Sequence, residues 1–229
     1  MAATAAAAFA LLVTPGARAT NAADWHYAME MPDSMLQIGS RKLHLPPGHW
    51  TLVERGEFTS TAFRSASTTY TVWAVRIENN AFTMGVTLSL PMQRLININR
   101  WGPDPCVQRS NLIHQKILSN SAAFPECLSI EGSLSFLQYL RYTNMPVSVW
   151  FEGHKFEDTD GLVHILYTKN HNTTFGRVSV FLPTKAFGSD VELVRWAESL
   201  PRVLGPFIDN DVDDATLPAP PPVTPAEAP

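Results

Sequence analysis

Two alternating segments on either side of an asparagine pair constrain the fold of this chain more than any other feature. Residues 69–78 and 81–90 carry apolar side chains at every second position, as a strand with one buried face does. Asn79-Asn80 between them tolerates the positive φ angles of a two-residue turn. Closing that turn predicts an apolar face with three cross-strand pairs: Ile77 with Phe82, Val75 with Met84, and Trp73 with Val86.

Two further hairpins can be read from the sequence. Segments 36–38 and 41–45 flank Gly39-Ser40, a sequence compatible with a type II′ turn. Segments 162–169 and 176–182 flank a loop rich in Asn and Thr. In that hairpin one apolar face is expected to pair Val163, Ile165 and Tyr167 with Val178, Val180 and Leu182. Residues 49–58 and 147–152 are expected to form additional strands.

Helices are expected at two or three places. Ser133 can cap a helix that ends near Asn144, and Asp190 can cap another that Pro201 ends or restarts. Residues 110–118 are a third candidate. Short connections favour antiparallel neighbours, so the sequence predicts an α+β fold: a largely antiparallel β-sheet of hairpins with two or three packing helices.

The two ends of the chain differ from its body. Residues 2–13 form an apolar run, and Ala17-Arg18-Ala19 has the small-x-small form of a signal-peptidase site. We therefore expect a signal peptide at 1–19 and a periplasmic or secreted protein, the alternative being an Ala-rich tail on a cytosolic protein. The run is too short for an integral membrane span. We expect a single domain at 20–206 and a disordered, acidic, Pro/Ala-rich tail at 207–229.

The charge of the body argues against two classes of partner. Between residues 20 and 206 the chain has 16 Lys and Arg against 16 Asp and Glu. Nucleic-acid binding needs a basic face to neutralise phosphates, and a membrane-surface patch needs a basic cluster. No nucleic-acid partner is therefore predicted.

The only cysteines of the chain are Cys106 and Cys127. In an oxidising compartment they are expected to form a structural disulfide that closes a loop of 22 residues. A redox-active or metal-binding thiol pair is the alternative, but the Cys-x-x-Cys spacing typical of such pairs is missing.

No motif identifies catalytic, cofactor-binding or metal-binding residues. The seven histidines lack the spacing of a zinc site, and His154 and His171 are expected in loops at opposite ends of the sheet. Residues 158–161 faintly resemble a calcium loop but lack its distal bidentate Glu. Nucleophile motifs of the Gly-x-Ser-x-Gly and Ser-x-x-Lys kinds are also missing. Trp73 and Trp196 fall at core positions and are expected to be structural rather than carbohydrate-stacking residues.

The segment Leu45-Pro46-Pro47-Gly48-His49-Trp50-Thr51-Leu52-Val53 carries a resemblance. This Pro-Pro-Gly-x-Trp entry into a strand, with the hairpins and the late Trp-bearing helix, resembles uncharacterised secreted or periplasmic proteins of Gram-negative bacteria. The likeness covers about residues 36–90 and 147–205. It implies a periplasmic setting and supplies no activity and no site residues.

Three functions remain open. The first is a non-catalytic binding or interaction module that contacts an envelope protein or a cell-wall component. The second is a periplasmic hydrolase whose site is built from scattered residues. The third is a secreted inhibitor or effector.

Overall fold

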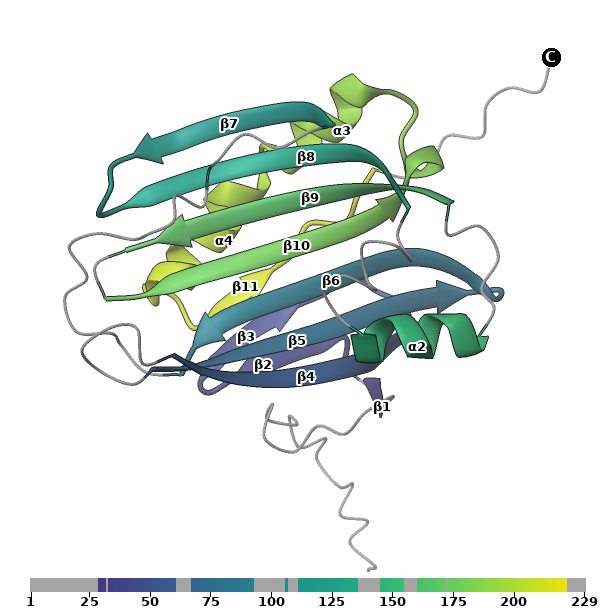
Figure 1. The fold of residues 1–229 in the computed structure, drawn as a ribbon, viewed down its shortest axis with the longest axis horizontal. Helices are drawn as coiled ribbons and strands as arrows, with labels where there is room; N and C mark the ends of the chain where they lie inside the picture. The colour runs from purple at the N-terminus through teal and green to yellow at the C-terminus, as the bar shows by residue number, and fades with distance from the viewer. Residues whose placement is uncertain are drawn as a thin grey trace, which may run out of the picture.

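The protein has the α+β architecture expected from its hairpins, with three layers (Figure 1). Its structure is a computed structural model that describes residues 29–31, 33–60, 67–92, 106, 111–135, 145–154, 160–171 and 173–221. The expected signal peptide lies outside these residues. In Figure 1 one helix lies in front of a large sheet, and a small sheet and two helices lie behind it.

The large sheet is antiparallel and has the strand order β1-β4-β5-β6-β10-β9-β8-β7. Its strands are β1 (Met29–Met31), β4 (Trp50–Ser60), β5 (Ser67–Glu78), β6 (Ala81–Pro91), β7 (Leu112–Asn120), β8 (Pro125–Ser135), β9 (Asp160–Asn170) and β10 (Phe175–Pro183).

The small sheet has the order β11-β3-β2. It contains β2 (Met35–Ile38), β3 (Arg41–His44) and β11 (Asp214–Thr216), and β11 runs parallel to β3. The helices are α2 (Met145–His154), the short 3₁₀ helix η2 (Thr184–Ala186), α3 (Asp190–Ala197) and α4 (Leu200–Asp209). No helix among the described residues is long and apolar enough to cross a bilayer.

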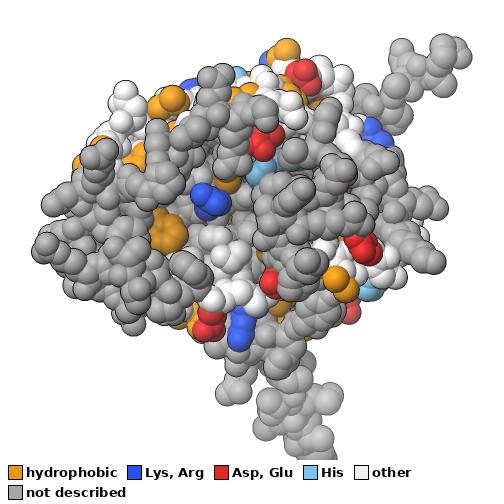
Figure 2. Space-filling model, viewed as in Figure 1, with side chains coloured by type: hydrophobic (Ala, Val, Ile, Leu, Met, Phe, Trp, Pro, Cys, Tyr) orange, Lys and Arg blue, Asp and Glu red, His pale blue; other side chains and the backbone are white. Residues whose placement is uncertain are grey.

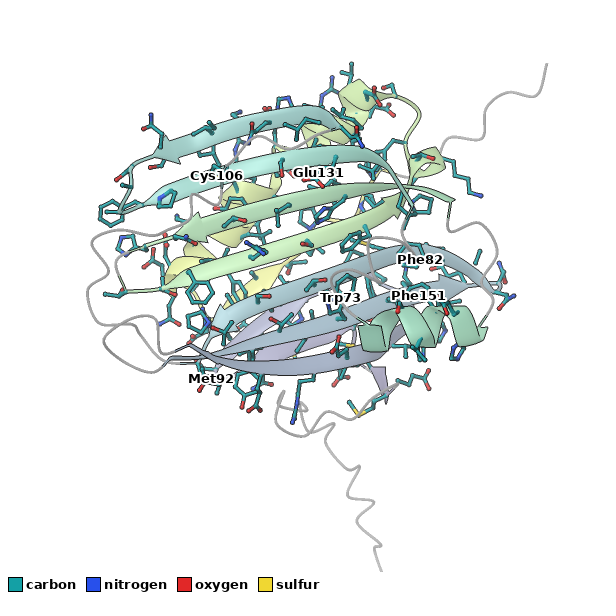
Figure 3. The ribbon with its side chains drawn as sticks, viewed as in Figure 1. Trp73, Phe82, Met92, Cys106, Glu131 and Phe151 are labelled. Atoms are coloured by element: carbon teal, nitrogen blue, oxygen red, sulfur yellow. A yellow bond between two sulfur atoms is a disulfide. The ribbon has the colours of Figure 1, made fainter. Side chains whose placement is uncertain are left out.

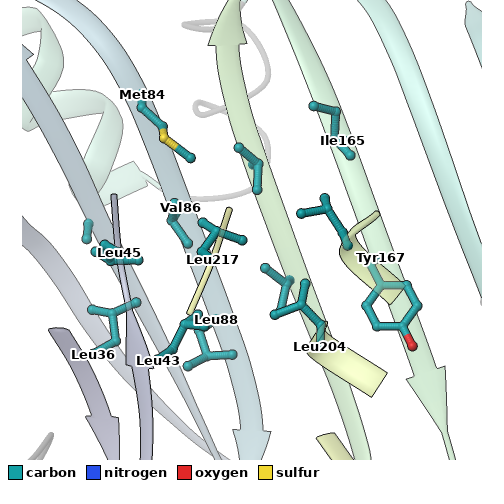
Figure 4. Close-up of a cluster of buried hydrophobic side chains, with 14 of the residues drawn as sticks. Leu36, Leu43, Leu45, Met84, Val86, Leu88, Ile165, Tyr167, Leu204 and Leu217 are labelled. Carbon is teal, nitrogen blue, oxygen red and sulfur yellow. The ribbon is translucent and has the colours of Figure 1, made fainter. Parts of the chain in front are cut away.

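Both faces of the large sheet carry a hydrophobic core. The larger core fills the space between this sheet and the layer of the small sheet, α3 and α4, where Leu43, Leu204 and Leu217 meet Val86 and Leu88 (Figure 4). The smaller core lies under α2 and contains the following side chains: Val53, Trp73, Val75, Phe82, Trp150, Phe151, Leu162 and Phe181. Strands buried on both faces need apolar residues at successive positions, and the centres of β5 and β6 supply them.

The hairpin of β5 and β6 forms as expected at its turn but differs beyond it. Asn79 and Asn80 have φ angles of 51° and 61°, and Ile77 lies opposite Phe82. A β-bulge then shifts the register by one residue, so the expected pairs of Val75 with Met84 and of Trp73 with Val86 are wrong. Trp73 lies opposite Thr87, and Val75 lies opposite Gly85.

The other two hairpins form as the sequence predicted. In β9 and β10, Val163, Ile165 and Tyr167 lie opposite Leu182, Val180 and Val178. In β2 and β3, the turn contains Gly39 at a φ of 64°, the positive value that its first position requires. The strand expected at 49–58 is β4.

Two segments have the opposite secondary structure to the one expected. Residues 147–152 belong to α2, in which Ser148, Trp150 and Phe151 are buried and Val149 is exposed. Residues 112–118 of the expected helix at 110–118 lie in β7, which pairs with β8. Ser133 is not a helix cap, because β8 continues to Ser135; the rest of that expected helix, 136–144, lies outside the described residues.

The late helix is divided into two. Ser189, rather than Asp190, caps α3: its Oγ accepts a hydrogen bond from the backbone N–H of Glu192 at 3.3 Å. Pro201 lies in the first turn of α4, where its missing N–H costs nothing, so it restarts the helix as expected.

The chain beyond residue 206 continues with ordered elements in place of the expected tail. Helix α4 extends to Asp209, and β11 adds to the small sheet. Leu217 is buried, and the indole Nε1 of Trp196 donates to the carbonyl of Ala219 at 2.9 Å. The prediction of a tail relied on the acidic and proline-rich composition and overlooked the few apolar residues, such as Leu217, that anchor this segment. Residues 222–229 lie outside the described part of the chain.

The Pro-Pro-Gly-x-Trp segment builds a compact corner at the start of β4. Trp50 is fully buried, and its indole Nε1 donates to the carbonyl of Pro46 at 2.8 Å. The guanidinium of Arg76 lies 5.8 Å from the centre of the Trp50 ring and donates through Nη1 to the carbonyl of Pro47 at 3.0 Å. A side chain at Gly48 would collide with Arg76. The motif is therefore explained by local packing.

Candidate functional site

The expected disulfide between Cys106 and Cys127 is present, with 5.8 Å between the two Cα atoms. Both residues are buried, and the side-chain amide of Gln115 donates to the carbonyl of Cys106 at 3.0 Å. The bond ties residue 106 to β8 beside β7 (Figure 3). Its burial fits the structural role.

The described histidines are dispersed over several elements. His44 lies 3.4 Å from Asp214, and His49 lies 3.8 Å from Glu30, both at exposed positions. His154 ends α2 rather than lying in a loop after a strand, and His171 follows β9 beside Phe124. Within the described ranges, no group of three His, Cys, Asp or Glu side chains could hold a metal ion. Residues 158 and 159 of the calcium-like segment lie outside those ranges.

A buried pair that sequence reasoning missed lies on the α2 side of the sheet. Nδ1 of His164 is 3.3 Å from a carboxylate oxygen of Glu131, and both side chains are at least nine-tenths buried. The His164 ring stacks on Phe181 with an interplanar angle of 2°, and Phe181 stacks in turn on Trp73. A histidine beside a carboxylate is half of a catalytic triad. Here, however, the ring is 1% exposed and is sealed into the sheet.

A second polar cluster holds α4 against the large sheet. Lys169 on β9 lies 2.6 Å from Asp209 of α4 and 3.7 Å from Glu126 of β8. The hydroxyl of Tyr167 donates to Glu126 at 2.7 Å, and burial together with this hydrogen bond raises the Tyr167 pKa well above its usual range. Each of these four side chains has a partner within the cluster, although Oδ1 of Asp209 has none among the described residues, and we assign the cluster a structural role.

Exposed hydrophobic side chains gather at one edge of the large sheet. Of the eight exposed large hydrophobic residues in the described part of the chain, four lie on β7 and the turn to β8: Ile113, Ile117, Leu118 and Phe124. We call these four residues the β7 edge surface. Figure 2 shows hydrophobic side chains along the upper edge of the molecule, where Figure 1 draws β7. Clustered exposed apolar groups mark interaction sites, whereas scattered single ones are ordinary.

Among the strands that the structure describes, β7 is the last of the large sheet, but its shape disfavours open-ended strand addition. Its pairing with β8 is irregular between Leu112 and His114 and again between Ile117 and Ser119. Lys116 on β7 lies 3.0 Å from Glu198 at the end of α3. Bulges and charges are the usual protection of an edge strand against uncontrolled pairing. Side chains, rather than continuous backbone pairing, are therefore available for specific contacts.

A pocket of about 240 Å³ lies where the two sheets approach each other. The turn between β2 and β3, the end of β6, the start of β10 and the end of α4 all contribute to its wall, which includes Ser40, Arg41, Met92, Thr174 and Asn210. Arg41 is 7% exposed, and its Nη2 donates to the carbonyl of Pro91 at 2.7 Å. Burial lowers the Arg41 pKa, and the charge of nearby Asp213 opposes that shift.

A larger groove of about 340 Å³ lies beside the β5–β6 turn. Its walls include Arg76, Phe82 and Lys185 together with Ala219 and Pro220 of the C-terminal segment. The hydrogen bond from Trp196 holds Ala219 in place, so the C-terminal segment forms one side of the groove.

No family model, curated protein or solved structure matches this chain. Three surfaces that can receive a ligand therefore rest on geometry alone: the β7 edge surface, the pocket lined by Arg41 (the Arg41 pocket) and the groove beside the β5–β6 turn. None of them was predicted from the sequence. The exposure of residues 113–118 depends on β7 being an edge strand, and the pocket depends on four distant segments meeting.

Proposed function

We propose that this protein is an exported, non-catalytic interaction module of the cell envelope, and that it holds a partner protein on the β7 edge surface. The observation that carries this proposal is the gathering of half of the exposed large hydrophobic residues, among those described, on one strand and its turn. The signal-peptide-like leader and the disulfide support a periplasmic or secreted setting.

The composition of the surface fits protein recognition. Ile117 is 54% exposed and Leu118 is 39% exposed, so a partner could remove much apolar area from water. Lys116 and the Glu198 carboxylate lie beside them and supply a polar rim. An apolar centre with a polar rim is the usual anatomy of a protein interface.

A periplasmic hydrolase is the alternative, and Glu131 with His164 would be its residues. A general base must come within hydrogen-bond reach of its substrate. The His164 ring stacks on Phe181 and is almost fully buried, so the geometry favours binding over catalysis. A secreted inhibitor or effector would use the same docking surface with a partner from another cell.

Site-specific photo-crosslinking in the exporting cell tests the proposal. A photoreactive amino acid at Ile117 should yield a discrete crosslinked protein, whereas the same group at Val191 should not. Val191 is a suitable control because it is 65% exposed but stands alone on α3. A second substitution, Leu118→Asp, should remove the crosslink from Ile117, and Val191→Asp should leave it in place.

Three outcomes would contradict the proposal. Equal crosslinking from positions 117 and 191 would indicate random encounters. The lack of any crosslink from position 117 would show that no partner protein binds the β7 edge surface. A crosslinked dimer of this chain would show that the β7 edge surface binds a second copy of the chain rather than a different protein.

A further inference from the structure

A guanidinium group with unused hydrogen-bonding capacity lines the pocket between the two sheets. Arg41 begins β3, and its Nη2 is engaged by the carbonyl of Pro91. Its Nη1 is shielded from solvent and has no hydrogen-bond partner among the described residues. Buried arginine nitrogens are normally paired, because an unmade hydrogen bond to a charged group is costly.

The surrounding residues offer polar groups but no full counter-charge. Within the described part of the chain, no carboxylate lies at ion-pair distance from Arg41, although Asp213 is near enough to act on it electrostatically. The carboxylate of Asp213 accepts a hydrogen bond from the Ser40 hydroxyl at 3.1 Å. Thr174 and Asn210 complete the polar part of the wall.

We propose that the Arg41 pocket binds a carboxylate group of a small ligand or of a peptide end. A guanidinium matches the planar geometry of a carboxylate, and its field is weakly screened inside a pocket. The proposal is independent of the docking of a protein on the β7 edge surface.

The charges around the pocket favour one negative charge over two. The negative charge of Asp213 already offsets part of the positive charge of Arg41. Asn210 caps the C-terminal end of α4, which is the negative end of the helix dipole. A phosphate dianion would meet more repulsion at this position than a carboxylate monoanion. The pocket volume of about 240 Å³ suits a group of a few heavy atoms.

Titration of the mature protein with matched probes tests the proposal. The probes are acetate, inorganic phosphate, and a short neutral peptide prepared both with a free C-terminal carboxylate and as its amide. Two-dimensional NMR should show saturable shifts of the Arg41, Ser40 and Thr174 amides with the free acid. The amide should bind at least about tenfold more weakly, because it lacks the charge-assisted hydrogen bond.

Variants on one strand provide the control. Arg41→Met should abolish binding of the free acid, whereas Lys42→Met, on the next residue of β3, should leave it unchanged. Equal binding of acid and amide, unchanged binding by Arg41→Met, or no saturable shift would overturn the proposal. Tighter binding of phosphate would overturn the choice of carboxylate. The comparison of acid with amide uses the unmodified protein, so it decides the question even where Arg41→Met fails to fold.

Discussion

One inserted residue decides which face of the large sheet each side chain of β6 occupies. Ile77 lies opposite Phe82 and Arg76 lies opposite Met84, so no residue of β5 lies directly opposite Thr83 in the register. This bulge directs Phe82 into the core under α2 and Met84 into the larger core. Its position is fixed by Arg76, whose Nε donates to the Thr83 hydroxyl and whose carbonyl accepts from it, both at 3.0 Å.

Removing the Thr83 hydroxyl should destabilise the bulge. We expect Thr83→Val to lower the free energy of unfolding by about 1–3 kcal/mol, because the backbone carbonyl of Arg76 loses its hydroxyl donor and the Arg76 Nε keeps only the Glu78 carboxylate, 3.3 Å away. Thr83→Ser keeps the hydroxyl and should cost less. Urea denaturation of the three proteins measures the difference. A larger loss for Ser than for Val would show that the methyl group, rather than the hydroxyl, matters.

At the scale of elements, the sequence predicted hairpins better than isolated segments. Strands joined by short turns constrain each other, so β2 with β3 and β9 with β10 have the expected partners. An isolated segment of six to ten residues has no such constraint, and apolar spacing alone leaves helix and strand ambiguous. That ambiguity explains why α2 was expected as a strand and β7 as a helix.

The candidate sites illustrate the same limit. The disulfide was predictable because the chain has only two cysteines and an export-like leader. The pairing of Glu131 with His164 was not, because it depends on the register of β8 against β9. The pocket at Arg41 depends in addition on the placement of Asn210 at the end of α4, in a region that its composition marked as a tail.

An ion-pair cluster joins the edge strand to the helix behind it. Glu198 at the end of α3 lies 3.0 Å from Lys116 and 3.3 Å from His114, both on β7. The hydrogen bond from Lys116, with the charges of both residues, lowers the Glu198 pKa below its ordinary value of 4.5. A carboxyl whose pKa is lower in the folded state stabilises the fold above pH 4.5, and the effect is lost as the pH falls through the lowered pKa.

The pH dependence of a Glu198→Gln variant tests this link. Its melting temperature should lie slightly below that of the unmodified protein at pH 7, since the cluster is exposed to solvent. The difference should shrink below pH 4.5 and disappear once Glu198 is protonated. Lys116→Met should produce the same pattern, because it removes the other partner. A difference that persists at low pH would assign the loss to packing instead.

At the scale of the whole molecule, segments distant in sequence close the structure. Strand β11 pairs with β3, and the backbone N–H of Leu217 donates to the carbonyl of His44 at 2.8 Å. Leu217 itself lies in the larger core beside Leu43 and Leu45 (Figure 4). Strands β2 and β3, near the start of the described chain, and β11, its last strand, are thus parts of one layer, which packs on the back of the large sheet (Figure 1).

At the opposite side of the molecule, β7 depends on fewer contacts. Among the described strands it pairs only with β8, and much of its surface is exposed. The disulfide between Cys106 and Cys127 closes the loop that contains β7. We therefore expect the disulfide to stabilise the whole fold and to protect β7 in particular.

Replacing both cysteines by serine tests this expectation without leaving a free thiol. In the chain-entropy description, opening a loop of 22 residues lowers the free energy of unfolding by about 3 kcal/mol. The unmodified protein under reducing conditions should lose the same amount, because the cross-link rather than the side-chain volume is responsible. Hydrogen exchange should accelerate more in β7 than in β5, which has neighbours on both sides. An unchanged unfolding curve would show that β7 is held by its pairing with β8 and its ion pairs to Glu198 alone. Equal acceleration in both strands would show that the disulfide does not protect β7 in particular.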